Sequence, residues 1–201
     1  MPDRREVFGR AALEVIAGGG VRALTHRAVD VAAGLPPGSV NYYAPSRAKL
    51  HQLALVEAYN EMYAIAGRAF TPVIEYMQNV GRPTRDVIVD GTVAFVEAMT
   101  DEGRGLVVAR HALLIEAQFD DDLRELVTAH RARFIQFTDR IALASNPELP
   151  DRYAELTVAL IEGLIQQQTL VAHRQFSRPL LRVTVARLYG FRDEVFNIPA
   201  T

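Results

Sequence analysis

Residues 37–49 combine small, hydroxyl-bearing, aromatic and basic side chains in close succession. Side chains of these types donate hydrogen bonds to phosphates and can reach base edges in nucleic acids. Residues 37–39 have little bulk, so a helix that begins there could bring its unpaired first-turn amides close to a polyanion. Val40 is the expected inward anchor, which leaves residues 41–43 to contact phosphates or bases.

The flanking sequence predicts the elements that would hold these side chains. Thr25 is a good N-cap, so we expect a helix from about His26, and Gly34 stands where a left-handed residue would end it. A second short helix is expected over residues 37–43, because proline fits the opening of a helix, and Pro45 ends it. Two such helices form a helix-turn-helix pattern, although an ordinary helical hairpin has the same spacing.

This stretch resembles the DNA-binding segment of the TetR family of transcriptional regulators. That segment runs L-T, a short helix ending in A-G, a helix with the pattern G-[ST]-x-x-[YH]-[YH], and a loop with S-[KR] and a leucine. Two positions depart from the family: Asp30 replaces an alanine that is frequent there, and Ala44 replaces the usual phenylalanine. The matching residues are Leu24, Thr25, Ala33, Gly34, Gly38, Ser39, Tyr42, Tyr43, Ser46, Arg47 and Leu50.

The resemblance implies particular DNA contacts. Arg27 stands where a base-contacting arginine often lies, and other positions of the motif supply phosphate contacts. The alternative for the arginines is a solvated surface charge, and for Tyr43 it is packing on Leu50. The expected DNA-binding residues are Thr25, Arg27, Pro37, Gly38, Ser39, Asn41, Tyr42, Tyr43, Arg47 and Lys49.

Charge is distributed unevenly along the 201 residues. The net charge is −2, but residues 1–50 hold seven Lys and Arg against four Asp and Glu, whereas the remainder holds 15 against 20. The basic part coincides with the helix-turn-helix pattern, which favours nucleic-acid binding there. Chance asymmetry of a few charges is the alternative.

The composition gives little support to other classes of protein. The chain has no Cys, which excludes disulfides, thiolate metal sites and cysteine nucleophiles. Its five His residues form no metal-ligand spacing, and no Gly-rich phosphate loop or nucleophile elbow occurs. We therefore expect no catalytic residue, metal or cofactor. No apolar run is long enough for a signal or membrane segment, so we expect a cytoplasmic protein without a membrane partner.

Apolar residues recur at helical spacing along the rest of the chain, and no strand-like alternation is sustained. The predicted fold is all-α, with a three-helix DNA-binding unit in residues 1–48 and a larger helical ligand-binding and dimerisation domain in residues 49–201. A helix beginning at Lys49 would link the two. The further helices are expected over residues 3–18, 49–69, 71–80, 84–100, 106–119, 120–144, 151–173 and 177–191.

The last two predicted helices are apolar on more than one face. So wide an apolar surface usually needs a second cover. In the TetR family the last two helices of each subunit form a four-helix dimer interface, and Gly163 would allow close approach there. The alternative is that these faces are core of a single subunit. A twofold dimer would present two recognition helices about one DNA turn apart and require a near-palindromic operator.

The resemblance also implies an effector pocket enclosed by the middle helices, within residues 59–170. Polar groups among apolar neighbours are the candidates for its lining, together with nearby aromatic and methionine side chains. Each of them could equally be an ordinary core residue. The expected effector-binding residues are Met62, Tyr63, Phe95, His111, Gln118 and Phe119.

The sequence therefore predicts a homodimeric transcriptional regulator that binds double-stranded DNA, with a repressor released from its operator by a small molecule as the preferred form. One alternative is a helical interaction or ligand-binding dimer without sequence-specific DNA binding. Another is a helical enzyme whose active-site residues are dispersed along the chain.

Overall fold

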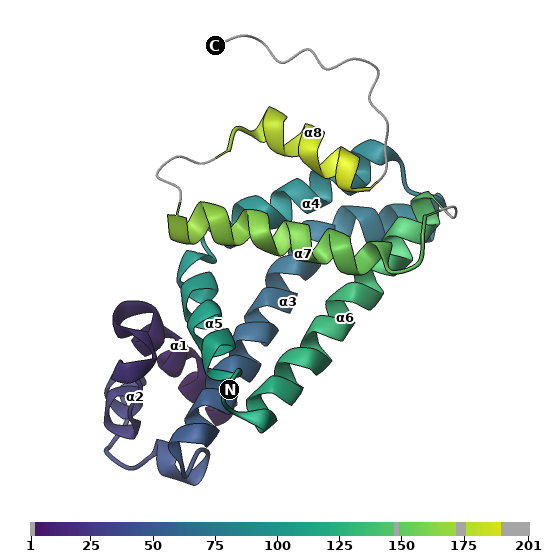
Figure 1. The fold of residues 1–201 in the computed structure, drawn as a ribbon. Helices are drawn as coiled ribbons and strands as arrows, with labels where there is room; N and C mark the ends of the chain where they lie inside the picture. The colour runs from purple at the N-terminus through teal and green to yellow at the C-terminus, as the bar shows by residue number, and fades with distance from the viewer. Residues whose placement is uncertain (1–2, 147–148, 172–175, 190–201) are drawn as a thin grey trace. The chain divides into compact units, whose positions relative to one another are not determined.

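A computed structural model describes residues 3–146, 149–171 and 176–189. All regular elements within these ranges are helical, which confirms the predicted fold class (Figure 1). The chain divides into two compact units, here called unit 1 and unit 2. Unit 1 comprises residues 1–66 and 98–133, and unit 2 comprises residues 67–97 and 134–201. The functional division at residue 48 remains a prediction, because compactness alone does not locate a DNA-binding function.

Helix α1 (Arg4–Ala23) opens unit 1 and runs further than expected. The Asp3 carboxylate accepts the Arg5 backbone N–H at 3.1 Å, which caps its first turn. The helical conformation is interrupted only at Gly20, whose φ of 71° is left-handed, and one more turn follows. The run Gly18–Gly20, just after the expected end at residue 18, therefore produces a kink and not an end, because only Gly20 leaves the helical region.

Helix α2 (His26–Ala32) begins as predicted. The Thr25 hydroxyl accepts the backbone N–H of Ala28 at 3.1 Å, which is the N-cap bond anticipated from the sequence. Gly34 follows the helix with φ of 65°, so it is the left-handed residue that ends it. The beginning and end of α2 are thus both set by local sequence.

Helix α3 (Arg47–Asn79) is one helix of 33 residues and not the two that were expected to meet near residue 70. Pro72 lies inside it. Phe70 and Val73 on either side of the proline are buried, and the Phe70 ring lies 5.1 Å from that of Phe137. Burial of this apolar face within unit 2 stabilises a continuous helix despite the backbone hydrogen bond that proline removes.

Unit 1 is completed by α5 (Arg104–Glu116) and the first part of α6 (Asp121–Ser145). Helix α5 packs on α1, where a Cβ added to Gly105 would lie 3.7 Å from that of Ala17. Leu55, Leu113 and Leu123 are fully buried, and each comes from a different helix of the unit. This core supports α1, α2 and the turn that follows α2.

Unit 2 contains α4 (Arg85–Thr100) up to residue 97, α7 (Tyr153–Gln166) and α8 (Arg178–Leu188). A π-helical turn, Gln167–Val171, extends α7. Helices α7 and α8 lie alongside each other, since the Thr157 hydroxyl donates to the Leu188 carbonyl at 3.2 Å (Figure 1). The predicted ends of the last two helices, residues 172–173 and 190–191, lie outside the described residues.

Ion pairs hold α8 against α4 within unit 2. Arg182 pairs with Asp86 at 3.1 Å and also with Asp90, and Arg178 pairs with Glu97. Tyr189, just after α8, is buried and receives a hydrogen bond from Thr92 at 3.3 Å. One side of α8 therefore packs against α4.

Candidate nucleic-acid interface

The segment after α2, residues 36–44, is called the recognition turn. A helix was predicted over residues 37–43, but the structure has a single 3₁₀ turn, Val40–Tyr42. Gly38 adopts φ of 87°, which interrupts any helix that begins at Pro37. The Ser39 N–H bonds instead to the Pro36 carbonyl at 3.2 Å. The prediction of a helix was wrong because the left-handed glycine lies inside the predicted span.

The recognition turn has both buried and exposed side chains. Val40 and Ala44 are fully buried, as the inward role predicted for Val40 requires. Asn41 is exposed, and the Tyr42 side chain is 87% exposed. The Ala44 carbonyl also accepts a hydrogen bond from Nε2 of His26 at 2.7 Å. Asn41 and Tyr42, which are suited to base or phosphate contact, are therefore exposed between two buried residues, Val40 and Ala44.

The Asp30 side chain accepts hydrogen bonds from two backbone N–H groups of the recognition turn. Its carboxylate is buried and accepts the N–H groups of Gly38 at 2.6 Å and Val40 at 2.9 Å. The sequence suggested that first-turn amides would be free to meet a polyanion. That expectation was wrong, because a residue of α2 already occupies two of these amides.

Tyr43 is half-buried and packs against α1. Its ring centroid lies 5.3 Å from that of Phe8 and 5.1 Å from that of Tyr42. The Phe8 ring is buried in the core of unit 1. Tyr43 thus supports the exposed Tyr42 ring from the side that faces α1, an aromatic contact for which the sequence gave no specific signal.

The basic side chains of the motif are placed differently from one another. Arg47 donates to the carbonyls of Val21 at 2.8 Å and Leu24 at 3.2 Å, so its guanidinium satisfies the end of α1. Lys49 donates to Gln52 Oε1 at 2.7 Å. Arg27 lies on the exposed side of α2. Arg47 therefore has a structural function in addition to any contact with DNA.

The remaining predicted contacts also lie in unit 1. Pro37 and Gly38 are exposed, and the Ser39 hydroxyl donates to the Pro36 carbonyl at 2.6 Å. All ten predicted DNA-binding residues lie on or beside α2, on the recognition turn, or in the first turn of α3. The structure brings them together in one unit, and their contact with DNA remains a prediction.

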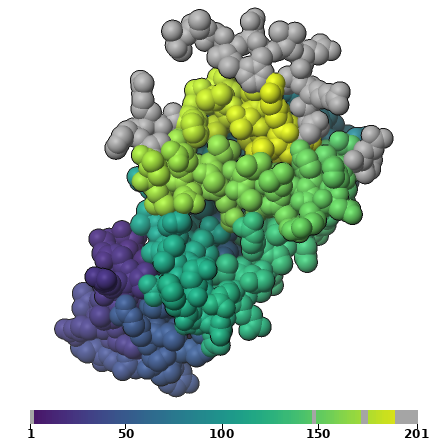
Figure 2. Space-filling view, in the orientation of Figure 1, coloured from purple at the N-terminus to yellow at the C-terminus, as the bar shows by residue number. Residues whose placement is uncertain are grey.

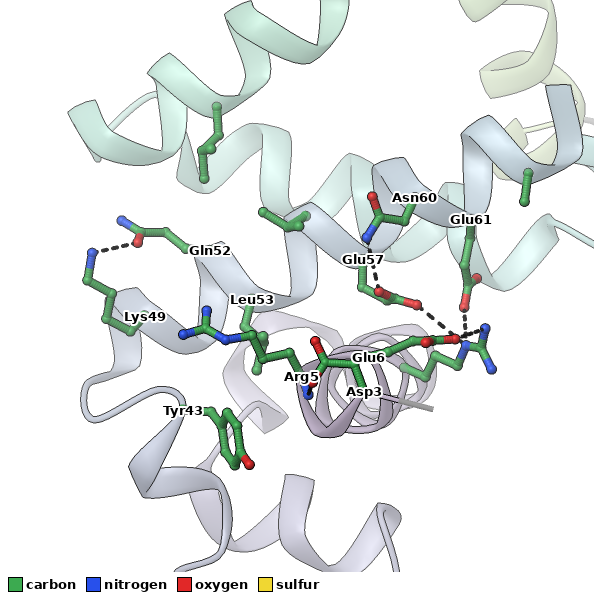
Figure 3. Close-up of a pocket in the computed structure, with 14 residues that line it drawn as sticks. Asp3, Arg5, Glu6, Tyr43, Lys49, Gln52, Leu53, Glu57, Asn60 and Glu61 are labelled. Atoms are coloured by element: carbon green, nitrogen blue, oxygen red, sulfur yellow. Dashed lines mark hydrogen bonds and ion pairs between the residues drawn. The ribbon is translucent and has the colours of Figure 1, made fainter. Parts of the chain in front are cut away.

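An open groove of about 690 Å³ adjoins the recognition turn within unit 1 (Figure 3). It is lined by α1, α3, the beginning of α6 and the Tyr43 ring. At one end Arg10 contacts three carboxylates, with nitrogen–oxygen distances of 2.6 Å to Glu6 and 3.4 Å to both Glu57 and Glu61. Burial raises the pKa of both Glu57 and Glu61. This acidic end would favour a cation over an anion.

The predicted effector-binding residues are scattered through both units. Met62 is buried in unit 1, and His111 of α5 is half-buried there. Phe95 belongs to unit 2, where its ring lies 6.1 Å from that of Phe70. Gln118 and Phe119 follow the end of α5, and Phe119 is 86% exposed. These two do not line an enclosed cavity in the described structure, and the whole set remains a prediction.

Tyr63, the sixth candidate, belongs to an aromatic cluster that was not predicted. The His130 ring stacks on that of Tyr59 with centroids 4.3 Å apart, and Tyr63 Oη lies 2.9 Å from His130 Nδ1. The Arg110 guanidinium lies 5.4 Å from the Tyr59 ring centroid. Tyr59 and Tyr63 stand four residues apart on α3, a spacing that could have indicated a shared partner.

Two other features are absent from residues 3–146, 149–171 and 176–189. No group of three or more His, Asp or Glu side chains there could hold a metal ion. None of the helices in those ranges combines the length and the apolar character needed to cross a membrane.

Comparison with known proteins gives the family. A family model described as the tetracyclin repressor-like C-terminal domain matches residues 83–190, which is more than half of the chain. The chain therefore belongs to the TetR-like family. Members of this family are transcriptional regulators that bind DNA, so the chain is a DNA-binding transcriptional regulator and not an enzyme, as its sequence predicted. A comparison with curated protein sequences found no match.

Solved structures share the fold. The candidate transcriptional regulator SCO7518 from Streptomyces coelicolor A3(2) is 23% identical with a TM-score of 0.67, and the alignment covers 94% of this chain and 99% of that one. The multidrug binding protein EbrR, complexed with imidazole, is 21% identical with a TM-score of 0.68, over 100% and 94%. A transcriptional regulator from Rhodococcus sp. Rha1 is 17% identical with a TM-score of 0.70, over 94% and 95%.

Proposed function

We propose that the protein is a homodimeric repressor that reads a near-palindromic operator through the recognition turn and leaves it when a small molecule binds. The observation that carries this proposal is the pairing of the exposed Asn41 and Tyr42 with the buried anchors Val40 and Ala44. The anchors hold the two exposed side chains in a defined position, as side-chain contacts to base edges require. The proposed contacts are the ten DNA-binding residues named above. The proposed place of action is the cytoplasm.

An apolar face on α7 and α8 supports the dimer. Leu156 is 56% exposed and Leu160 is 43% exposed, one helical turn apart, and the exposed Gly163 continues the same face. A Cβ added to Gly163 would meet no atom within 4 Å, so a partner helix could approach closely there. Leu180 of α8 is also exposed, on a helix whose other side is held by α4. Both helices lie at the surface of unit 2 in Figure 2.

The second copy of this chain is the occupant that we propose for this face. Replacing Leu156 and Leu160 by Glu should yield a monomer in sedimentation equilibrium, because like charges would face each other across the twofold axis. Val80→Glu is the control, since Val80 is an exposed apolar residue of the same unit. A dimer that survives the double substitution would place the interface elsewhere.

Operator recognition can be tested without knowledge of the regulated genes. The wild-type chain is used to select bound duplexes from a random pool, and we expect an inverted repeat whose half-sites lie about 34 Å apart centre to centre. Affinity for the selected duplex, measured by fluorescence anisotropy, should fall steeply as salt rises. A pool that shows no enrichment, or enrichment of an unrepeated sequence, would contradict the proposal.

Effector release is proposed to act through α3, which begins beside the recognition turn. Ligand bound among the candidates of unit 1 on α3 and α5, Met62, Tyr63 and His111, would shift this helix and change the separation of the two recognition turns. A coupling of about 1–3 kcal/mol would then lower the affinity for the operator. Tyr63 lies on α3 itself, which makes its contacts the most direct route for such a change.

Ethidium and malachite green are suitable first probes, because structurally similar EbrR has been solved in complex with each. Ethidium fluorescence should change on binding, and saturating probe should release the selected duplex. Because ethidium also intercalates into DNA, release has to be confirmed with malachite green and with Tyr63→Ala. Tight binding of probe that leaves the operator affinity unchanged would separate ligand binding from regulation.

A further inference from the structure

Asp30 is the buried charged residue that the family motif does not account for. It lies on α2 and is 1% exposed. Its Oδ2 accepts the Gly38 N–H at 2.6 Å, and its Oδ1 accepts the Val40 N–H at 2.9 Å. Each oxygen of one carboxylate is thus committed to a different amide of the recognition turn. Hydrogen bonds to an ionised acceptor are roughly twice as strong as neutral ones.

Short-range backbone bonds and the buried anchors Val40 and Ala44 also hold the recognition turn, but the bonds of its Gly38 and Val40 amides come from Asp30. Pro36 and Pro37 have no backbone N–H, and Gly38 adopts a left-handed φ of 87° that keeps the segment out of a regular helix. Asp30 supplies the two acceptors that a preceding helical turn would otherwise provide. Because Asp30 is part of α2, these bonds fix the turn relative to the helix that carries Arg27.

The charge of the carboxylate has a second consequence. Free amides at the beginning of a helix attract phosphate, and that attraction does not depend on base sequence. In this chain the Gly38 and Val40 amides are occupied by a buried carboxylate, whose negative charge is bonded to the same turn that carries the exposed Asn41 and Tyr42. Phosphate binding by the amide of the exposed Gly38 is therefore suppressed, while side-chain contacts from the turn are held in place.

We propose that Asp30 is a positioning residue that raises the discrimination between operator and other DNA. It does so by ordering the turn that carries Asn41 and Tyr42 and by weakening sequence-independent attraction to phosphate. The inference rests on the proposed operator binding. It predicts opposite effects on two kinds of duplex, which a residue that only stabilised the fold would not produce.

The test compares wild type with Asp30→Asn and Asp30→Ala on two duplexes. One is the duplex selected by the wild-type chain from a random pool, and the other is a shuffled sequence of the same length. Asparagine keeps the shape and one accepting oxygen but removes the charge and the second acceptor. Glu14→Gln, an exposed residue of α1, is the control for losing one negative charge from unit 1.

In Asp30→Asn the affinity for the shuffled duplex should rise severalfold, and the ratio of shuffled to selected dissociation constants should fall about tenfold. Asp30→Ala should lower the ratio further, and Glu14→Gln should leave it near the wild-type value. Thermal unfolding of each variant, followed by circular dichroism, identifies the temperature at which it is folded. If Asp30→Ala does not fold, the ratio of dissociation constants measured for Asp30→Asn tests the proposal.

Two results would overturn the role of Asp30 alone. One is an unchanged ratio of the two dissociation constants in folded Asp30→Asn, which includes an equal loss of affinity for both duplexes, and the other is a lower affinity for the shuffled duplex. Failure of the wild-type chain to enrich any sequence from the pool would instead overturn the proposed operator binding. The two failures are therefore distinguishable within one set of measurements.

Discussion

The hydroxyl oxygen of Tyr63 on α3 lies 2.9 Å from Nδ1 and 3.2 Å from the carbonyl oxygen of His130 on α6. The His130 ring also stacks on Tyr59, one helical turn before Tyr63. A neutral imidazole with its proton on Nε2 can accept from the hydroxyl, whereas a protonated one cannot. The Tyr63 hydroxyl also donates to the His130 carbonyl, so the two helices are joined through a half-buried, titratable ring.

This contact predicts a loss of stability in mild acid. Burial, and the charge of Arg133, lower the pKa of His130 below its ordinary value of 6.5. The unfolded chain then binds more protons than the folded one, so the free energy of unfolding falls as pH drops through 6.5 toward the lowered pKa. Urea unfolding at pH 7.5 and 5.5 should show a smaller loss for His130→Gln than for wild type. Equal losses would mean that His130 titrates normally.

Part of the acid sensitivity should remain in that variant. His51 is also buried, and burial, followed by the charge of Arg47, lowers its pKa in the same direction. Adding His51→Gln to His130→Gln should therefore flatten the dependence further. Additive changes would show that the two sites titrate independently.

Glu57 predicts a pH dependence of opposite sign. Burial raises the pKa of its carboxyl above the ordinary 4.5, so the folded chain binds more protons than the unfolded one within that window. The free energy of unfolding should consequently fall as pH rises through it. Glu57→Gln should raise the melting temperature at pH 7 relative to wild type, with a difference that disappears below pH 4.5. A melting temperature at pH 7 below that of wild type would show that the Arg10 ion pair outweighs burial.

Gly9 and Gly18 on α1 form a matched pair. A Cβ added to Gly9 would lie 2.6 Å from the Cβ of buried Glu57, whereas one added to Gly18 would meet nothing within 4 Å. Gly9→Ala should destabilise the protein by about 1–3 kcal/mol through overpacking. Gly18→Ala should stabilise it by about 0.5–1 kcal/mol, because alanine favours the helix. Denaturant midpoints measure both, and stabilisation by Gly9→Ala, as expected for Gly18→Ala, would mean that α1 and α3 are not so closely packed.

Substitutions of Arg27 and Arg47 should distinguish a residue that only contacts DNA from one that also stabilises the fold. Arg47→Ala removes the donors to the Val21 and Leu24 carbonyls, so we expect a loss of about 1 kcal/mol of stability together with weaker operator binding. Arg27 is exposed, so Arg27→Ala should weaken operator binding at unchanged stability. The readouts are the denaturant midpoint and anisotropy with the selected duplex. Loss of stability in Arg27→Ala, or none in Arg47→Ala, would reverse these assignments.

The sequence by itself determined the helical fold class and most helix boundaries, and it indicated where a DNA-binding motif would lie. Thr25 caps α2 and Gly34 ends it, and both act through hydrogen bonds and backbone angles within a few residues. Such local chemistry can be read from residue type and spacing. The apolar surplus of the last two helices was visible for the same reason, since Leu156 and Leu160 recur at helical spacing and are exposed.

Only the tertiary structure decided what residues far apart in the sequence do to one another. Asp30 was only a departure from a motif until its carboxylate was found on amides 8 and 10 residues away, where it replaces part of an expected helix. The 33-residue α3 likewise required burial of Phe70 and Val73, which no local signal around Pro72 indicates. Buried charge and packing depend on which helices meet, and residue spacing within one helix does not specify that.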